Sequence, residues 1–189
     1  KEYHGKHEWT SEIYKALKNT FKLHSFRDNQ LNAINATLSG DDVFVLMPTG
    51  GGKSLCYQLP AIIKSGVTSG VTIVISPLIS LMEDQVSHLL NMNIKAAMLN
   101  SKMALSERKS YFARFIQGDI DLMYLSPEMI SKSEQSKRAI KSLYDNGKLA
   151  RIVIDEAHCV SAWGHDFRPD YKQLKFFKNE YPDIPMMAL

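Results

Sequence analysis

The segment from Met47 to Ser54, Met-Pro-Thr-Gly-Gly-Gly-Lys-Ser, constrains the fold of this chain more than any other. It follows a short apolar run at residues 43–46 and precedes a second apolar segment, which is the strand, turn and helix context of a phosphate-binding loop. Successive glycines let several main-chain N–H groups face one anion, and the N-terminus of the next helix adds a positive dipole. The segment therefore predicts a phosphate-binding loop followed by a helix that begins near Lys53.

Two side chains of this loop carry the chemistry that nucleotide hydrolysis requires. Lys53 has the reach to meet β- and γ-phosphate oxygens, and the Ser54 hydroxyl is placed to bind Mg²⁺. The general pattern has glycine where this chain has Met47. The alternative is a glycine-rich turn with a surface lysine, which requires no ligand. The residues that we assign to ATP in this loop are Thr49, Gly50, Gly51, Gly52, Lys53 and Ser54.

Composition places the chain among soluble globular proteins, with 44% apolar and 23% charged residues in a length that suits one domain. The net charge of +3 permits an anionic partner without arguing for one. Cys56 and Cys159 lie far apart and outside any Cys-x-x-Cys pair, so we expect a reducing compartment, no disulfide framework and no zinc. No apolar run approaches the ~18 residues of a membrane span, and we expect no membrane partner. The apolar run that ends at Leu189 suggests a piece of a longer protein.

Apolar runs alternate with amphipathic stretches along the chain. A loose polar lead-in to Trp9 precedes a helix capped by Ser11 and a second helix from about Asp28 to Gly40, and the helix after the phosphate loop is expected to bend or end near Pro60. Strands that are apolar on both faces and separated by helices predict an α/β fold with three layers, α/β/α, and a mainly parallel sheet. The expected strands are residues 43–46, 71–75, 96–99, 122–125, 152–154 and 186–189, and further helices are expected near residues 79–91, 104–117, 134–145 and 170–181.

A second chemical segment, Asp-Glu-Ala-His, begins at Asp155, directly after the expected strand 152–154. A carboxylate at the end of a buried strand is costly unless a positive group meets it. In a phosphate-loop fold that group is Mg²⁺, which Asp155 holds through water together with Ser54, while Glu156 orients and deprotonates the attacking water. Alone, the segment is equally consistent with a chance acidic pair. Together with Lys53 and Ser54, it predicts hydrolysis of a nucleoside triphosphate.

The two segments together resemble superfamily 2 helicases, in which Ala or Met often replaces the first loop glycine. Longer strings resemble the RecQ family, and in particular its eukaryotic Bloom-type branch. The resemblance extends over nearly the whole chain from residue 12 onward. The strings that carry it are Phe-Arg-Asp-Asn-Gln at 26–30, the phosphate loop with Leu-Cys-Tyr-Gln-Leu-Pro at 47–60, Ser-Pro-Leu-Ile-Ser-Leu-Met-Glu-Asp-Gln at 76–85, and His-Cys-Val-Ser-Ala-Trp-Gly-His-Asp-Phe-Arg-Pro-Asp-Tyr at 158–171.

The resemblance implies the first RecA-like, P-loop motor lobe of an ATP-dependent DNA helicase that moves 3′ to 5′ and acts in recombination and repair. Residues 1–40 then hold two helices with the adenine motif and belong to the same lobe as residues 41–189, which end before the third helicase motif; the second lobe is absent. The implied catalytic residues are Lys53, Asp155, Glu156 and His158.

The resemblance also implies an adenine motif, which consists of Leu23, Arg27 and Gln30. A glutamine amide offers a donor and an acceptor to the purine edge, and an arginine can lie flat on the ring. Sequence position alone would make Gln30 a solvent-facing helix residue. Lys22 stands where the family usually has glycine.

DNA contacts are implied for four polar residues, Ser76, Ser80, Asn100 and Ser101, and by extension for Ser126 and Pro127. Hydroxyls and N–H groups at the start of a helix can hold a nucleic-acid phosphate, although helix capping explains the serines equally well. The resemblance also implies a DNA-sensing, aromatic-rich loop that couples DNA to hydrolysis through Trp163, His165, Phe167 and Arg168. Core anchoring is the alternative for the aromatic residues. Ala162 departs from the usual glutamine, and His24 and His88 are interpreted as ordinary histidines.

The expected cofactors are ATP and Mg²⁺. The expected partners are single-stranded and partly duplex DNA, the second lobe of the same longer chain and, by resemblance, a complex with a type I topoisomerase. The expected location is the nucleus if the source is eukaryotic, as the Bloom-type resemblance suggests, and the cytoplasm otherwise. The alternatives are an RNA helicase lobe of the DEAD/DEAH kind and a nucleotide- and DNA-binding module that is inactive in isolation.

Overall fold

The computed structural model describes residues 5–47, 52–100, 102–155 and 175–189. Residues 175–180 form a further helix, which has no label of its own. The labelled elements are α1 (Thr10–Asn19), α2 (Gln30–Leu38), β1 (Val43–Phe44), α3 (Leu55–Ala61), β2 (Val71–Ile75), α4 (Ile79–Asn91), β3 (Ala96–Leu99), α5 (Leu105–Ile116), β4 (Leu122–Leu125), α6 (Pro127–Ser131), α7 (Glu134–Asp145), β5 (Leu149–Ile154) and β6 (Met186–Ala188).

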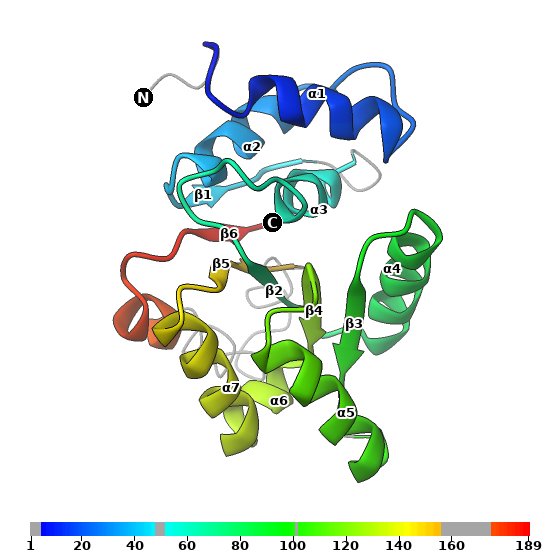
Figure 1. The fold of residues 1–189 in the computed structure, drawn as a ribbon, viewed down its shortest axis with the longest axis vertical. Helices are drawn as coiled ribbons and strands as arrows, with labels where there is room; N and C mark the ends of the chain where they lie inside the picture. Colours follow the sequence, from blue (N-terminus) through cyan, green and yellow to red (C-terminus); the bar gives the residue numbers. More distant parts are fainter. Residues whose placement is uncertain (1–4, 48–51, 101, 156–174) are drawn as a thin grey trace.

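The six strands form one sheet in the order β1-β6-β5-β2-β4-β3 (Figure 1). Every pair of neighbouring strands is parallel. Parallel neighbours require crossover connections, and the intervening helices supply them. The predicted parallel sheet is therefore confirmed, and all its described strands end at one edge.

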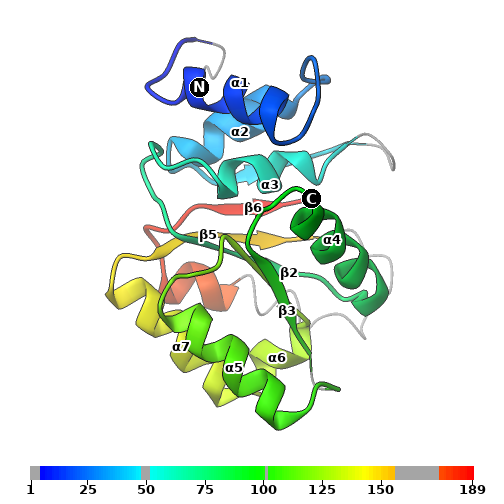
Figure 2. The ribbon, with the colours of Figure 1, turned by 45° about the vertical axis from the view of Figure 1, so that its right-hand side comes forward.

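The sheet is covered on both faces because its strands are apolar on both sides. On β2, Ile73 and Ile75 face a core shared with α5, α6, α7 and the helix at 175–180, whereas Val74 faces a core shared with α2, α3 and α4. A third cluster joins Ile13 and Leu17 of α1 to α2 and α3, so that α1 lies outside these two helices (Figure 2). The predicted three layers are confirmed.

The N-terminal segment differs from the sequence prediction. α1 begins at Thr10 after an N-cap at Trp9, so Ser11 is not the cap. Trp9 is only 6% exposed, its ring stacks on His7, and its Nε1 donates a 2.8 Å hydrogen bond to Asn35 Oδ1. The expectation of a loose lead-in is thus wrong at Trp9, because a distant amide on α2 satisfies the buried indole.

Other boundaries shift by a few residues. α2 begins at Gln30 and ends at Leu38, and α3 begins at Leu55 and ends one residue after Pro60, as expected for a proline near a helix end. The short α6 has no counterpart in the sequence prediction; it begins with Pro127 at its first position.

None of the helices in the described ranges has the length and apolar character needed to cross a bilayer.

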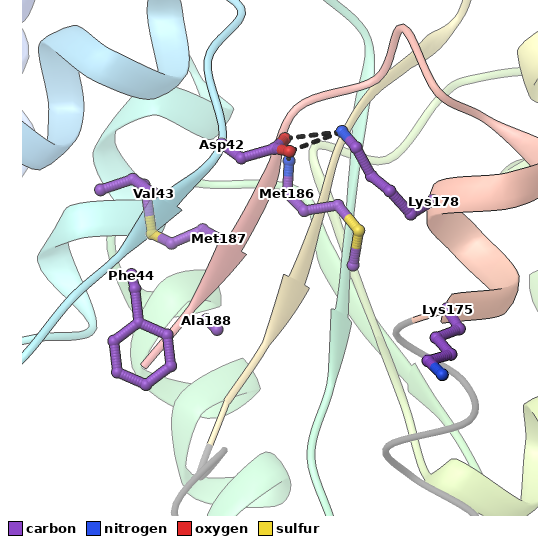
Figure 3. A pocket seen from close by; sticks show the side chains of 8 residues that line it. All are labelled: Asp42, Val43, Phe44, Lys175, Lys178, Met186, Met187 and Ala188. Carbon is purple, nitrogen blue, oxygen red and sulfur yellow. Dashed lines mark hydrogen bonds and ion pairs between the residues drawn. The ribbon is translucent and has the colours of Figure 1, made fainter. Parts of the chain in front are cut away.

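Asp42 fixes the edge of the sheet where β1 and β6 meet. Its carboxylate forms an ion pair with Lys178, 2.6 Å from Oδ2 to Nζ, and accepts a 2.9 Å hydrogen bond from the Met186 main-chain nitrogen (Figure 3). These contacts hold the helix at 175–180 and the start of β6 against the start of β1. A pocket of about 490 Å³ lies beside them, lined mainly by apolar side chains such as Phe44, and it contains none of the predicted site residues.

Candidate functional site

Four polar residues directly follow four strands that lie side by side in the sheet. In the order of the strands β5, β2, β4 and β3, these residues are Asp155, Ser76, Ser126 and Asn100. All four are buried. Because the strands are parallel, their carboxyl ends share one edge, which is where open α/β sheets bind ligands.

At this edge a cleft of about 570 Å³ unites segments that are far apart in the sequence. The cleft is lined by the segment between α1 and α2, the start of α3, one face of α4 and Asp155. Seven of the predicted site residues line this cleft, namely Leu23, Arg27, Gln30, Gly52, Lys53, Ser54 and Asp155. His88, interpreted from the sequence as an ordinary histidine, also lines this cleft.

Gln30 is 3% exposed, so the solvent-facing position that its place on a helix suggested is wrong. Its Oε1 accepts a 2.7 Å hydrogen bond from the Arg27 main-chain nitrogen, and its Nε2 donates a 2.8 Å bond to the Gly52 carbonyl. The amide nitrogen and the amide oxygen of Gln30 can each form one further hydrogen bond, because the nitrogen has two protons and the oxygen has two lone pairs. The side chain thus joins the predicted adenine motif to the predicted phosphate loop and can still meet a purine edge.

A left-handed backbone occurs at three described residues in or beside the cleft, namely Lys22, Asn29 with φ of +70°, and Gly52. Gly52 has φ of +77°, and a Cβ there would lie 2.7 Å from Gln30 Nε2, so a side chain at this position would strain the backbone and displace the Gln30 amide. Lys22 has φ of +57°, the conformation that glycine adopts without strain. The positive φ gives a physical reason for the glycine that the RecQ resemblance leads one to expect at position 22.

The donor set near the start of α3 fits a magnesium ion bound together with phosphates. Ser54 occupies the N-cap position of α3, and its side chain makes no capping bond to the helix. Asp155 is 6% exposed and faces the same cleft. Mg²⁺ prefers hard oxygen ligands and takes one or two from protein beside phosphate oxygens. Within the described part of the chain, no cluster of three or more His, Cys, Asp or Glu side chains forms a cage for a metal.

A buried tyrosine adjoins Asp155, and sequence reasoning did not identify it. Tyr57 is fully buried on α3, and its hydroxyl donates a 3.3 Å hydrogen bond to Asp155 Oδ2. The same hydroxyl lies 3.1 Å from that of Tyr124 on β4. Burial, followed by the nearby Tyr124 and Asp155, raises the pKa of Tyr57 well above its ordinary value. The only sequence signal for this contact was the presence of polar atoms in an otherwise apolar helix.

The residues predicted to contact DNA have different surroundings. Ser80 is exposed on the first turn of α4. Ser76 is buried, and its Oγ accepts a 3.5 Å bond from the Leu78 main-chain nitrogen. Asn100 is also buried, and its Oδ1 accepts a 2.9 Å bond from the Lys102 nitrogen. Ser126 Oγ has no hydrogen-bond partner among the described residues. Their contact with DNA therefore stays a prediction.

Several predicted site residues lie outside the described residues. These are Thr49, Gly50, Gly51, Ser101, Glu156, His158, Trp163, His165, Phe167 and Arg168. Cys159 also lies there, whereas Cys56 is buried as predicted for a small apolar residue, and burial raises the pKa of its thiol to about 12.

The chain is similar to known helicases. Residues 27–189 match the sequence family described as DEAD/DEAH box helicase. The chain is 70% identical over 181 residues to the ATP-dependent helicase SGS1 of Saccharomyces cerevisiae, covering 96% of this chain and 12% of that protein. It is 50% identical over 182 residues to the RecQ-like DNA helicase BLM of Xenopus laevis, covering 95% of this chain and 13% of that protein.

The fold has counterparts among solved structures. The DUF1998 helicase MrfA, solved with DNA and AMPPNP, matches with a TM-score of 0.73 at 21% identity, over 98% of this chain and 26% of that chain. This likeness concerns the fold, and it supports the predicted RecA-like architecture. The chain spans about an eighth of the length of the two curated relatives named above. It belongs to the DEAD/DEAH box helicase family, and RecQ-type helicases are among its relatives.

Proposed function

We propose that this chain is the ATP- and DNA-binding first motor lobe of an ATP-dependent 3′–5′ DNA helicase of RecQ type that acts in recombination and repair. Residues 1–40, with the adenine motif, then form part of the same lobe as residues 41–189. The family assignment and the RecQ-like relatives support this proposal.

The observation that carries the proposal is that Gln30 and Gly52, which are joined by a hydrogen bond, line the same cleft as Asp155. This supports a nucleotide site in which the expected adenine motif, residues 52–54 of the expected phosphate loop and the carboxylate proposed for the metal border one space. The cleft volume of about 570 Å³ lies within the range of small-molecule and cofactor sites. ATP fits this arrangement, with its base near Leu23, Arg27 and Gln30.

The proposed roles follow from this placement. Lys53 binds the β- and γ-phosphates, together with Gly52 and with Thr49, Gly50 and Gly51 of the same loop. Ser54 and Asp155 hold Mg²⁺, which when bound neutralises part of the phosphate charge. Glu156 orients and deprotonates the attacking water, and His158 completes the acidic segment. These residues supply only part of the groups needed for ATP hydrolysis. The charge that develops on the γ-phosphate also needs a positive group, which the second lobe would provide.

For DNA we propose that Ser76, Ser80, Asn100 and Ser101 contact the backbone of the single strand. Ser76 and Asn100 directly follow β2 and β3, and Ser80 lies in the first turn of α4, where helix N-termini and hydroxyls can bind phosphate. Trp163, His165, Phe167 and Arg168 are proposed to sense the single strand and to signal to the hydrolysis site. Single-stranded and partly duplex DNA and the second lobe are the proposed partners, with a type I topoisomerase complex as a further one. The eukaryotic relatives support a nuclear location.

The test is ATP hydrolysis by the purified full-length protein with single-stranded DNA, single-stranded RNA or neither. We expect DNA to stimulate turnover more than RNA, and Lys53→Ala to abolish both turnover and unwinding, because the lysine charge stabilises the transition state. Stimulation mainly by RNA would favour the RNA helicase alternative. Near-normal turnover by Lys53→Ala would place the nucleotide site elsewhere.

Two further measurements test the need for a second lobe and the role of Trp163 in DNA sensing. The isolated 189 residues should show ATPase near background and no unwinding, since one lobe has no second lobe to close over ATP. In the full-length protein, Trp163→Ala should keep basal ATPase and lose stimulation by DNA. A large loss of thermal stability together with basal ATPase would instead support core anchoring of Trp163.

A further inference from the structure

A chain of hydrogen bonds runs through the apolar core between the sheet and two helices, and it ends on Asp155. Tyr57 bonds to Asp155 at 3.3 Å and to Tyr124 at 3.1 Å. The Tyr124 hydroxyl is 3.2 Å from Gln58 Nε2, and the same nitrogen donates to Gln85 Oε1 on α4. Tyr57, Tyr124 and Gln58 are each at most 3% exposed.

The direction of these bonds follows from the number of protons available. An ionised carboxylate only accepts, so Tyr57 uses its single proton on Asp155. Tyr57 must then accept from Tyr124, whose proton is thereby used. Tyr124 accepts in turn from Gln58, whose amide nitrogen has two protons and can serve both Tyr124 and Gln85. Every donor in the series has a defined acceptor, and the whole series is aligned toward Asp155.

The same helix carries the other proposed ligand of the metal. Ser54 is the N-cap of α3, and its carbonyl accepts bonds from the main-chain nitrogens of Tyr57 and Gln58 at 3.2 and 2.9 Å. Tyr57 is therefore rigidly connected to Ser54 through one helical turn and to Asp155 through its hydroxyl. A group that holds a metal-binding carboxylate in place from the second shell affects metal affinity without touching the metal.

We propose that Tyr57 is a positioning residue that fixes the Asp155 carboxylate relative to Ser54, and that Tyr124, Gln58 and Gln85 brace it against β4 and α4. This inference rests on the proposed function, because it assigns Ser54 and Asp155 to the metal. Packing alone does not account for the arrangement: a phenylalanine at position 57 would fill the same apolar space without burying a hydroxyl.

The test compares Tyr57→Phe with Tyr144→Phe in the full-length protein. Tyr144 is a matched control, because its hydroxyl also donates to a carboxylate, Asp183 Oδ1 at 2.7 Å, but on the surface beside α7. Binding of Mn²⁺ as a probe is measured by electron paramagnetic resonance in the presence of ADP, and the Mg²⁺ concentration for half-maximal ATPase is measured in parallel. We expect Tyr57→Phe to weaken metal binding about tenfold or more and to regain turnover at high Mg²⁺. Its affinity for ADP without metal should be unchanged, and Tyr144→Phe should match the wild type in every measurement.

Unchanged metal affinity in a folded Tyr57→Phe protein would overturn the proposal. If Tyr57→Phe has a much lower melting temperature than the wild type, Tyr124→Phe provides the test instead. That variant keeps the Tyr57–Asp155 hydrogen bond and removes only the hydroxyl that donates to Tyr57. A smaller shift in Mn²⁺ affinity in the same direction supports the brace, and no shift overturns it. Absence of ATPase in the wild type would count against the proposed function, while Mn²⁺ binding with ADP would still report on Tyr57.

Discussion

The Gln30 side chain donates a 2.8 Å hydrogen bond to the main-chain carbonyl of Gly52, although 21 residues separate the two in the sequence. One amide thereby connects the segment before α2 to the loop before α3. The contact connects the expected adenine site to the expected phosphate site. A substitution at either Gln30 or Gly52 should therefore weaken the binding of both the base and the phosphates of a nucleotide.

Replacing Gln30 by alanine should weaken ATP binding. The substitution removes the bond to Gly52 and leaves the Arg27 main-chain N–H without its acceptor, at a cost of about 1–3 kcal/mol. We expect the KM for ATP of the full-length protein to rise about tenfold, as 1.4 kcal/mol corresponds to a factor of ten. Gln117→Ala, an exposed glutamine at the end of α5, is the control and should leave the KM unchanged. Equal KM values for Gln30→Ala and the wild type would show that Gln30 does not support the nucleotide site.

Replacing Gly52 by alanine should damage nucleotide binding more than stability. Gly147 provides the comparison, because it too has a positive φ of +68° but has nothing within 4 Å of an added Cβ. Both substitutions carry a left-handed backbone cost of about 1–2 kcal/mol, but only Gly52→Ala also displaces the Gln30 amide. Calorimetry with ATP should therefore show weak or absent binding for Gly52→Ala and normal binding for Gly147→Ala. Similar losses in both variants would point to backbone strain alone.

Replacing Lys22 by glycine should stabilise the chain. Lysine at φ of +57° is strained, and relief of that strain exceeds the entropy cost of glycine, for a net gain of up to about 1 kcal/mol. Lys18→Gly is the opposite control, because Lys18 lies in the last turn of α1, where glycine costs about 1 kcal/mol. Urea denaturation should give a higher free energy of unfolding for the first variant and a lower one for the second. A lower value for Lys22→Gly would contradict the strain argument.

The two acidic residues after β5 should have separable roles. Asp155→Ala removes a buried carboxylate that faces the cleft and should weaken metal-dependent ATP binding. Glu156→Gln, which lies outside the described residues, keeps the shape of the side chain and removes the base. It should still bind ATP with Mg²⁺ and scarcely hydrolyse it. Calorimetry combined with ATPase assays on the full-length protein separates the two, and failure of Glu156→Gln to bind nucleotide would reverse the assignment.

Arg151 on β5 should be replaceable by methionine without loss of stability. Its guanidinium is 1% exposed and bonds to the hydroxyls of Thr37 at 3.1 Å and Thr72 at 2.9 Å, while Nη2 has no partner among the described residues. Burial lowers the pKa of Arg151 to about 10, so the group is still charged at neutral pH. Methionine fills the space of the stem and removes a poorly compensated charge.

The free energy of unfolding of Arg151→Met should therefore equal that of the wild type or exceed it by up to about 2 kcal/mol. Arg151→Ala should lose about 2–4 kcal/mol because it leaves a cavity. Urea denaturation of both variants checks the difference, and a methionine variant as unstable as the alanine variant would show that the charge itself stabilises the fold.

The architecture could be predicted from local sequence patterns. Residues 71–75, 96–99 and 122–125 are strands as predicted, and α7 spans residues 134–145 as predicted, because their apolar patterns are local properties of the chain. The glycine-rich segment before Lys53 and the carboxylate at Asp155 are likewise recognised from local sequence, and Gly52, Lys53 and Asp155 line one cleft at the end of the parallel strands.

Long-range hydrogen-bond partners could not be predicted from local sequence. Gln30 was expected to face solvent, Trp9 was expected in a loose lead-in, and no prediction singled out Tyr57, yet each donates a hydrogen bond to a residue between 22 and 98 positions away. Periodicity reports which face of a helix is buried, but it does not report which polar atom on a distant element meets a buried donor. That choice depends on how helices pack on the sheet, because a buried polar group is stable only where its partner lies within hydrogen-bonding distance.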